Sequence, residues 1–150
     1  MTGIHSSLSN VFAYEWIVDS GASHHTIPCN DLLFDIKKLD NHISDKVQVP
    51  TGGRCQITSA GNATIFGTSK IQNVLHVPDF KLNLLSVPKM TKELQCCMVF
   101  YPDFCLLQDL HTRKVRGTGR MEGCLYFWDH KEKECFAYAA SIGTQADHEL

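Results

Sequence analysis

The chain has 150 residues, a formal net charge of −2 and 43% hydrophobic residues, which fits one globular domain, or one small domain with a tail. The small net charge gives no reason to expect nucleic acid binding across the whole surface, and no apolar stretch approaches the ~18 residues that a membrane span needs. The first residues lack a basic segment followed by an apolar one, so we expect no signal peptide and a cytoplasmic protein.

The cysteine content is high, with seven cysteines in the chain. Cys96 and Cys97 are adjacent and the others stand alone, so the paired ligand spacings of zinc sites do not occur. Without a secretory signal, disulfide bonds are not expected. The cysteines are therefore interpreted as reduced, mostly buried thiols, and we expect no metal ion and no other cofactor. A zinc-binding module is the less favoured alternative.

The first predicted strand is an apolar run that ends in one carboxylate. Residues 1–12 are small, polar and without periodicity, which is typical of a flexible leader. The run up to Val18, which contains Trp16, predicts a short buried strand, and the small residues after Asp19 predict the turn that ends it. Taken alone, Asp19 has two interpretations: it only turns the chain, or its carboxylate is fixed beside a glycine that leaves room for backbone amides.

The middle of the chain predicts short strands joined by turns. Residues 31–34 predict a short helical or turn segment, and residues 37–45 predict a polar loop. Two alternating runs on either side of Gly52-Gly53 predict a β-hairpin, because glycine supplies the positive φ that such turns need. Three further strands are predicted at residues 61–67, 71–77 and 82–87.

A short helix and more strands complete the predicted elements. Pro88 suits the first turn of a helix, where its missing N–H is not needed, so a helix is predicted over Lys89–Leu94. From Asp129 onward the chain is charged and then Ala-rich, and we expect it to be weakly ordered. The fold class is therefore mainly β, a small barrel with one short helix. The last predicted strands cover residues 97–100, 104–107, 114–119 and 124–128.

Four blocks stand in an order that resembles a known family. They are Trp16–Ser23 (Trp-Ile-Val-Asp-Ser-Gly-Ala-Ser), the Gly-tipped hairpin, Asn73–Pro78 (Asn-Val-Leu-His-Val-Pro) and Asn83–Val87 (Asn-Leu-Leu-Ser-Val). This order resembles the aspartic protease segment of Ty1/copia-type retrotransposon polyproteins. Downstream, residues 105–126 look like the gag-pre-integrase segment that follows the protease in such polyproteins.

The resemblance implies a fold and an activity. The implied fold is a retropepsin-like acid protease barrel over residues 13–100, followed by a β-hairpin extension and tail over residues 101–150. The implied function is an aspartic endopeptidase that cleaves its own Gag-Pol-like polyprotein, in the cytoplasm and within a virus-like particle. The implied partners are a second copy of the chain and a polypeptide substrate, with no membrane and no direct nucleic acid binding.

A homodimer agrees with the residue count. The chain contains one Asp-Ser/Thr-Gly, which fits one catalytic Asp per chain. Aspartic proteolysis needs two carboxylates, one to activate water and one to protonate the scissile carbonyl. Two carboxylates held close cannot both ionise, so they share a proton and titrate as a pair.

The resemblance also assigns roles by position. Asp19 is the catalytic residue, and Ser20 is expected to hydrogen-bond across the dimer near its axis. Gly21 is expected to leave backbone room, while Ala22 and Ser23 line the pocket. The remaining assignments are the flap tip at Thr51, Gly52 and Gly53, the supporting core at Leu84 and Leu85, and an interface strand at Cys96–Phe100.

One alternative function stays open. Ser86 stands where related folds usually have glycine, and Pro50-Thr51 replaces the acidic or Asn residue that often precedes the flap glycine. Serine is common at the first of these positions in copia-type sequences. The altered flap, together with the absence of flanking polyprotein domains from these residues, favours a catalytically inactive structural or interaction domain, that is, a domesticated or decayed retroelement fragment.

Three other motifs have simpler interpretations. His24-His25 suggests a metal ligand or general base, but aspartic chemistry needs no imidazole, and adjacent strand side chains point to opposite faces. The basic cluster at residues 111–114 is interpreted as a solvated turn, and the aromatic residues 126–128 as core or hairpin packing.

Overall fold

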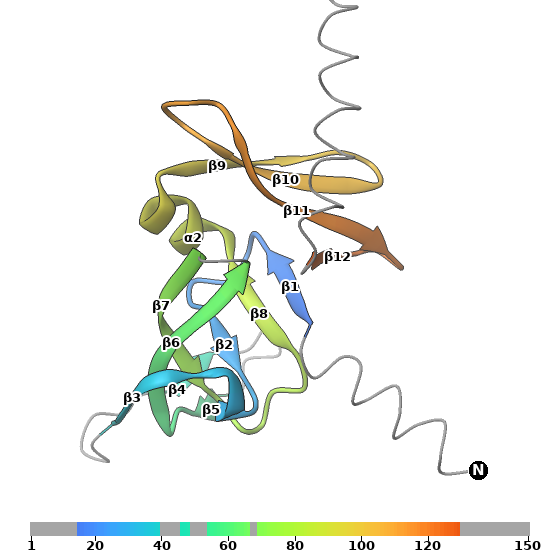
Figure 1. Ribbon diagram of the computed structural model, residues 1–150. Helices are drawn as coiled ribbons and strands as arrows, with labels where there is room; N and C mark the ends of the chain where they lie inside the picture. The colour runs from blue at the N-terminus through green and yellow to red at the C-terminus, as the bar shows by residue number, and fades with distance from the viewer. Residues whose placement is uncertain (1–14, 40–45, 49–53, 67–68, 130–150) are drawn as a thin grey trace, which may run out of the picture.

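The computed structural model describes residues 15–39, 46–48, 54–66 and 69–129. These residues are mostly β, with one short α-helix and one 3-10 helix (Figure 1). No helix among them has the length and apolar character needed to span a bilayer. The elements are β1 (Trp16–Asp19), β2 (Thr26–Ile27), η1 (Asn30–Leu32), β3 (Phe34–Lys38), β4 (Lys46–Gln48), β5 (Arg54–Gln56), β6 (Ser59–Phe66), β7 (Ser69–His76), β8 (Asn83–Ser86), α2 (Val87–Leu94), β9 (Cys96–Phe100), β10 (Phe104–Asp109), β11 (Val115–Glu122) and β12 (Leu125–Trp128).

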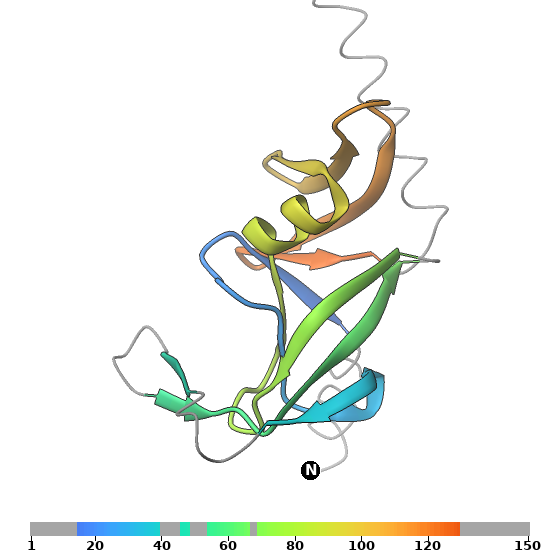
Figure 2. The same ribbon diagram turned by 90° about the vertical axis from the view of Figure 1, so that its left-hand side faces the viewer.

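Ten of these strands form one open sheet in the order β3-β6-β7-β2-β8-β1-β12-β11-β10-β9. The outer strands β3 and β9 each have one partner, so the sheet does not close on itself. The strands β4 and β5 form a separate antiparallel pair. Figures 1 and 2 show β9 to β12 at one end of the molecule and β3, β6 and β7 at the other, with α2 between the two ends.

Strand β1 lies at the centre of the architecture, because its two neighbours come from distant parts of the chain. It runs parallel to β8, with Val18 opposite Leu85, and antiparallel to β12, with Ile17 opposite Phe127. Trp16, Ile17 and Val18 are all buried. A continuous apolar run is what a strand covered on both faces requires, which explains why this segment does not alternate.

The core contains two tryptophans from opposite ends of the described chain. Trp16 and Trp128 are 1% and 0% exposed, and both belong to the main cluster of buried side chains. The ring of Trp128 lies against the backbone of β11, since a Cβ built on Gly117 falls 2.1 Å from its Cζ2 atom. A Cβ built on Gly119 would likewise lie only 2.7 Å from the Sγ atom of Cys105. The two glycines let β11 pack against bulky side chains.

Helix α2 confirms the predicted helix and extends it by two residues at its start. Ser86 is its N-cap, and the Ser86 hydroxyl accepts a hydrogen bond from the Lys89 amide at 3.2 Å. Pro88 lies in the first turn, as predicted. The helix ends at Gln95, which has the left-handed conformation. Met90 anchors the helix in the core, being fully buried.

An ion-pair cluster connects the segment before β1 with the last strands. The Arg120 guanidinium donates to both Glu15 carboxylate oxygens, at 2.9 and 2.7 Å, and to Asp129 Oδ1 at 3.1 Å. Asp129 is 1% exposed, and its second oxygen accepts from the Thr118 hydroxyl at 2.9 Å. A buried carboxylate needs such partners. The predicted boundary at residue 100 remains a prediction, but β10 to β12 continue the sheet that contains β1.

Several predictions of local structure are corrected. The loop predicted from residue 37 is wrong for residues 37 and 38, which belong to β3. Residues 35–38 are polar or exposed because β3 is an outer strand, so composition alone resembles a loop. The prediction of mostly buried thiols is wrong for the six described cysteines, of which only Cys96 and Cys105 are buried; none forms a disulfide. Burial raises the pKa of the Cys105 thiol to about 12.

The other strand predictions are confirmed in the described residues. The alternating runs around the Gly-Gly turn pair as β4 and β5, and the strands from residue 97 to residue 128 form two antiparallel hairpins. The aromatic residues 126–128 pack as predicted, with Phe127 and Trp128 buried. Residues 1–14, the flap tip at 51–53 and the tail from 130 lie outside the described residues.

Candidate active site

Asp19 is the last residue of β1 and lies at the edge of the buried core. Its Cα partner in β8 is Ser86, so the turn after β1 and the start of α2 leave the sheet side by side at this point. The apolar residues before it are buried, whereas Asp19 is half-buried and Ser20 is exposed. Strand β1 therefore presents one carboxylate at a solvent-facing turn on a rigid base.

A backbone amide fixes the Asp19 carboxylate. The Gly21 N–H donates to Asp19 Oδ1 at 2.8 Å, which closes a turn between residues two positions apart. A Cβ built on Gly21 lies 3.4 Å from the same oxygen, an ordinary contact distance. One copy of the chain therefore has space for alanine at this position. Within the described part of the chain, no other hydrogen bond to this carboxylate is found.

Ser86 holds the loop after Asp19 in place. Its hydroxyl donates to the Ala22 carbonyl at 2.6 Å while it caps α2, and its backbone N–H donates to His25 Nδ1 at 2.9 Å. Glycine at this position lacks the hydroxyl that makes the first two of these bonds. The departure from the family pattern at Ser86 thus has a structural reason. Beside it, Leu85 is fully buried in the core and Leu84 is half-buried.

His25 is a buried hydrogen-bond acceptor, and its neighbour His24 is exposed. Burial, followed by the positive charges of Lys89 and of His24, lowers the pKa of His25 from 6.5 to about 3. The ring is therefore neutral at pH 7, with its proton on Nε2, because Nδ1 accepts from Ser86. Nε2 lies 3.7 Å from a Glu93 carboxylate oxygen, too far for a hydrogen bond.

We expect His25 to make the fold sensitive to mild acid. Below pH 6.5 His25 is protonated in the unfolded chain, whereas in the folded chain it stays neutral down to about pH 3. The free energy of unfolding therefore decreases as the pH falls from 6.5 to about 3. At pH 5 the loss relative to pH 7 is about 2 kcal/mol. Urea unfolding at both pH values measures it, with His25→Asn as the control, because the Asn oxygen can accept from the Ser86 amide without titrating. An equal pH dependence of both proteins contradicts this role.

An open groove of about 470 Å³ runs alongside Asp19. It is lined by the end of β1 and its turn, residues 17–20, by Leu82 and Leu84 on the β8 side of β1, and by Phe100 and residues 124–126 on the β12 side. We call this hollow the Asp19 groove. Sequence reasoning missed its residues 100 and 124–126, because nothing in the local pattern indicates that β12 pairs with β1.

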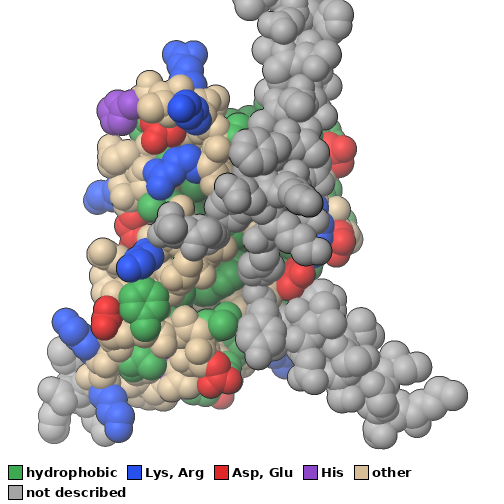
Figure 3. All heavy atoms as spheres, viewed as in Figure 1, with side chains coloured by type: hydrophobic (Ala, Val, Ile, Leu, Met, Phe, Trp, Pro, Cys, Tyr) green, Lys and Arg blue, Asp and Glu red, His purple; other side chains and the backbone are tan. Residues whose placement is uncertain are grey.

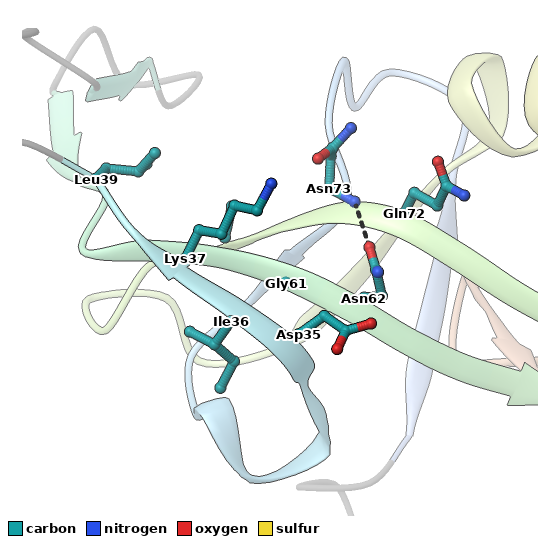
Figure 4. Close-up of a pocket in the computed structure, with 9 residues that line it drawn as sticks. Asp35, Ile36, Lys37, Leu39, Gly61, Asn62, Gln72 and Asn73 are labelled. Atoms are coloured by element: carbon teal, nitrogen blue, oxygen red, sulfur yellow. Dashed lines mark hydrogen bonds between the residues drawn. The ribbon is translucent and has the colours of Figure 1, made fainter.

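A second, larger hollow of about 720 Å³ lies between β3, β6 and β7 (Figure 4). Its polar lining includes Asp35, Lys37 and the amides of Asn62, Gln72 and Asn73. Asn62 Oδ1 accepts from the Asn73 backbone N–H at 3.3 Å. None of its lining residues belongs to the Asp19 groove. It is an exposed polar depression beside an outer strand, separate from the candidate site.

The charged side chains show no gathering of one sign on the face seen in Figure 3. Lys and Arg side chains are interspersed there with Asp, Glu and uncharged surface. Within the described residues, no three His, Cys, Asp or Glu side chains are grouped as they are around a metal ion. The chemistry that the described site offers is therefore that of a carboxylate beside an apolar groove.

The described residues form a mostly β domain with one short α-helix and a carboxylate at the edge of its core. Residues 16–94 match the family described as Pol polyprotein, beta-barrel domain, and the chain belongs to this family.

The chain is also similar to retrotransposon proteins of plants. It is 29% identical over 140 residues to the Retrovirus-related Pol polyprotein from transposon RE2 of Arabidopsis thaliana, which covers 91% of this chain and 9% of that protein. It is 27% identical over 140 residues to the corresponding protein from transposon RE1, covering 89% of this chain and 9% of that protein. Over 79 residues it is 34% identical to the one from transposon TNT 1-94 of Nicotiana tabacum. The chain thus spans less than a tenth of the length of these relatives. No solved structure matches it.

Proposed function

We propose that this chain is an aspartic endopeptidase of a copia-type retrotransposon that cleaves its own polyprotein. The observation that carries the proposal is the Asp19 carboxylate, held by the Gly21 N–H at 2.8 Å at the end of a buried strand and beside a groove. Membership of the Pol polyprotein family supports a retrotransposon origin. No cofactor is needed for this chemistry.

The proposed mechanism requires a homodimer with Asp19 from each copy at the two-fold axis. One carboxylate takes a proton from water as the water oxygen attacks the scissile carbonyl carbon, and the protonated partner gives its proton to the carbonyl oxygen. The C–N bond then breaks as the carboxyl group that took the proton from water gives it to the leaving amine. The other carboxylate takes a proton from the tetrahedral diol, so the pair again shares one proton. We expect Ser20 to hydrogen-bond across the axis and Thr51, Gly52 and Gly53 to cover the peptide.

Strand β9 supports the dimer part of the proposal. Like β3, it is an outer strand of the sheet, and in the described residues it is paired on one side with β10 and has no strand on its other side. An unpaired strand edge is a template for pairing with another chain. We assign β9 as the interface strand. Residues 101–150 remain assigned to a pre-integrase-like extension and tail.

Cleavage of a fused linker peptide tests the proposal. The full chain is fused to a polyprotein linker and assayed over about pH 5 to 7. We expect cleavage that pepstatin-type inhibitors slow, that Asp19→Asn reduces to background, and that an exposed-site control, Asp79→Asn, leaves unchanged. Sedimentation over a concentration series should show a dimer. Equal cleavage by wild type and Asp19→Asn, or a strictly monomeric wild type without cleavage, contradicts the proposal and favours the inactive structural domain.

A further inference from the structure

The Asp19 groove gathers most of the exposed large hydrophobic side chains of the described residues. Leu82, Phe100 and Leu125 are 37%, 42% and 42% exposed and all line it, while the other two members of this class, Ile36 and Leu110, lie elsewhere. Exposed apolar side chains that cluster in one hollow mark a binding surface. Asp19 and Ser20 line the same hollow.

The apolar wall on the β12 side is held in a fixed geometry. The rings of Phe100 and Tyr126 meet edge to face, with centroids 5.1 Å apart. The Tyr126 hydroxyl donates to the Tyr101 carbonyl at 2.6 Å, so its polar group is already bound and its ring remains for contact. A wall whose side chains are already ordered costs little entropy when a ligand arrives.

Leu125 is presented by a tight turn. Gly123 and Cys124 before it have φ of +53° and +74°, and β12 then pairs with β1 and β11. Leu125 therefore lines the groove at the first position of β12, where its backbone pairs with Glu122 of β11.

We propose that residues 100 and 124–126 form a specificity subsite for an apolar side chain of the polypeptide substrate, next to the bond that reaches Asp19. The inference rests on the proposed function and adds to it that residues after the matched family region, 16–94, select the substrate. The occupant is an extended peptide with a Leu or Phe side chain, because the same hollow is lined by the Asp19 carboxylate and by the apolar side chains of Leu82, Phe100 and Leu125.

The test uses the full chain and peptides that differ at one position beside the cleaved bond, carrying Leu, Phe, Ser or Asp there. Leu125→Ser is expected to lower kcat/KM for the Leu and Phe peptides about tenfold and to leave the Ser peptide within about twofold, the scale of discrimination that a hydrophobic pocket gives. Leu125→Lys is expected to raise the relative rate for the Asp peptide. Leu110→Ser is the matched control, since Leu110 is 52% exposed and outside the groove.

The outcomes separate the subsite from the protease proposal. If the wild type cuts and Leu125→Ser changes all peptides equally or none, the subsite is wrong. If Leu125→Ser leaves the peptide preference unchanged but weakens the dimer, the groove holds a second copy and the subsite is again wrong. If the wild type cuts none of the peptides, the protease proposal fails, and the affinity of the chain for the uncut peptides then tests the subsite. Tighter binding of the Leu and Phe peptides that Leu125→Ser abolishes supports the subsite. Equal binding of all peptides by the wild type overturns it.

Discussion

A chain that stops after Phe100 is expected to lose cooperative unfolding, whereas a chain that stops after Asp129 keeps it. The matched family region ends at residue 94, yet β1 has an antiparallel partner only through β12. Removing residues 101–150 takes away that partner, the β10 neighbour of β9 and the fully buried ring of Trp128. Loss of Trp128 alone should cost about 3–5 kcal/mol, a large part of the stability of a small domain.

Thermal and urea unfolding of the two truncated chains and the full chain measure this effect. The chain ending at Asp129 retains every contact described above, including the ion pairs of Arg120 with Glu15 and Asp129. The full-length Trp128→Ala variant shows whether core loss alone accounts for the change. A sharp transition at an unchanged temperature in the chain ending at Phe100 contradicts this prediction and indicates that the matched region folds independently.

Gly117→Ala is expected to destabilise the fold by about 3 kcal/mol, a cost typical of forcing extra atoms into a packed core. The new methyl group falls 2.1 Å from Cζ2 and 2.5 Å from Cη2 of Trp128. Because Trp128 is completely buried, its ring cannot move aside without displacing its neighbours. Urea unfolding at pH 7 gives the free-energy difference.

A double-mutant cycle isolates the contact. In a Trp128→Leu background, the cost of Gly117→Ala is expected to fall, because the clashing ring atoms are gone. Gly21→Ala serves as the matched control, because its Cβ meets Asp19 Oδ1 at an acceptable 3.4 Å. We expect that control to change the stability of one copy by less than about 1 kcal/mol. Equal costs of Gly117→Ala in both backgrounds contradict the packing account.

Local signals predict much of the fold. The Gly-Gly turn between alternating runs predicts the β4–β5 pair, and Ser86 and Pro88 stand where a helix start needs a cap and a first-turn proline. Strand β3 escapes prediction because an outer strand has few buried residues. The pairing of β1 with β12 could not be predicted for another reason. It depends on contacts between segments that are distant in the sequence, and a local residue pattern does not indicate such contacts.

The candidate site divides in the same way. The Asp19 turn is predictable because an apolar strand running into Asp-Ser-Gly is a local feature, and the structure places it beside Leu84. The far wall is not predictable, because Phe100 and Leu125 reach the groove only through long-range sheet order. The hydrogen bond by which Ser86 holds the loop after Asp19 could not be predicted for a related reason, because its partner Ala22 lies 64 positions earlier in the chain.

The order of strands around β1 has a consequence for synthesis on the ribosome. Ile17 leaves the exit tunnel early, but its partner Phe127 is made roughly 110 positions later, which takes on the order of ten seconds at ordinary elongation rates. Until then the turn that carries Asp19 lacks one flanking strand, and the hollow beside it lacks a wall. If the proposed protease acts on its own polyprotein, translation itself therefore delays the first cut until the downstream segment has emerged.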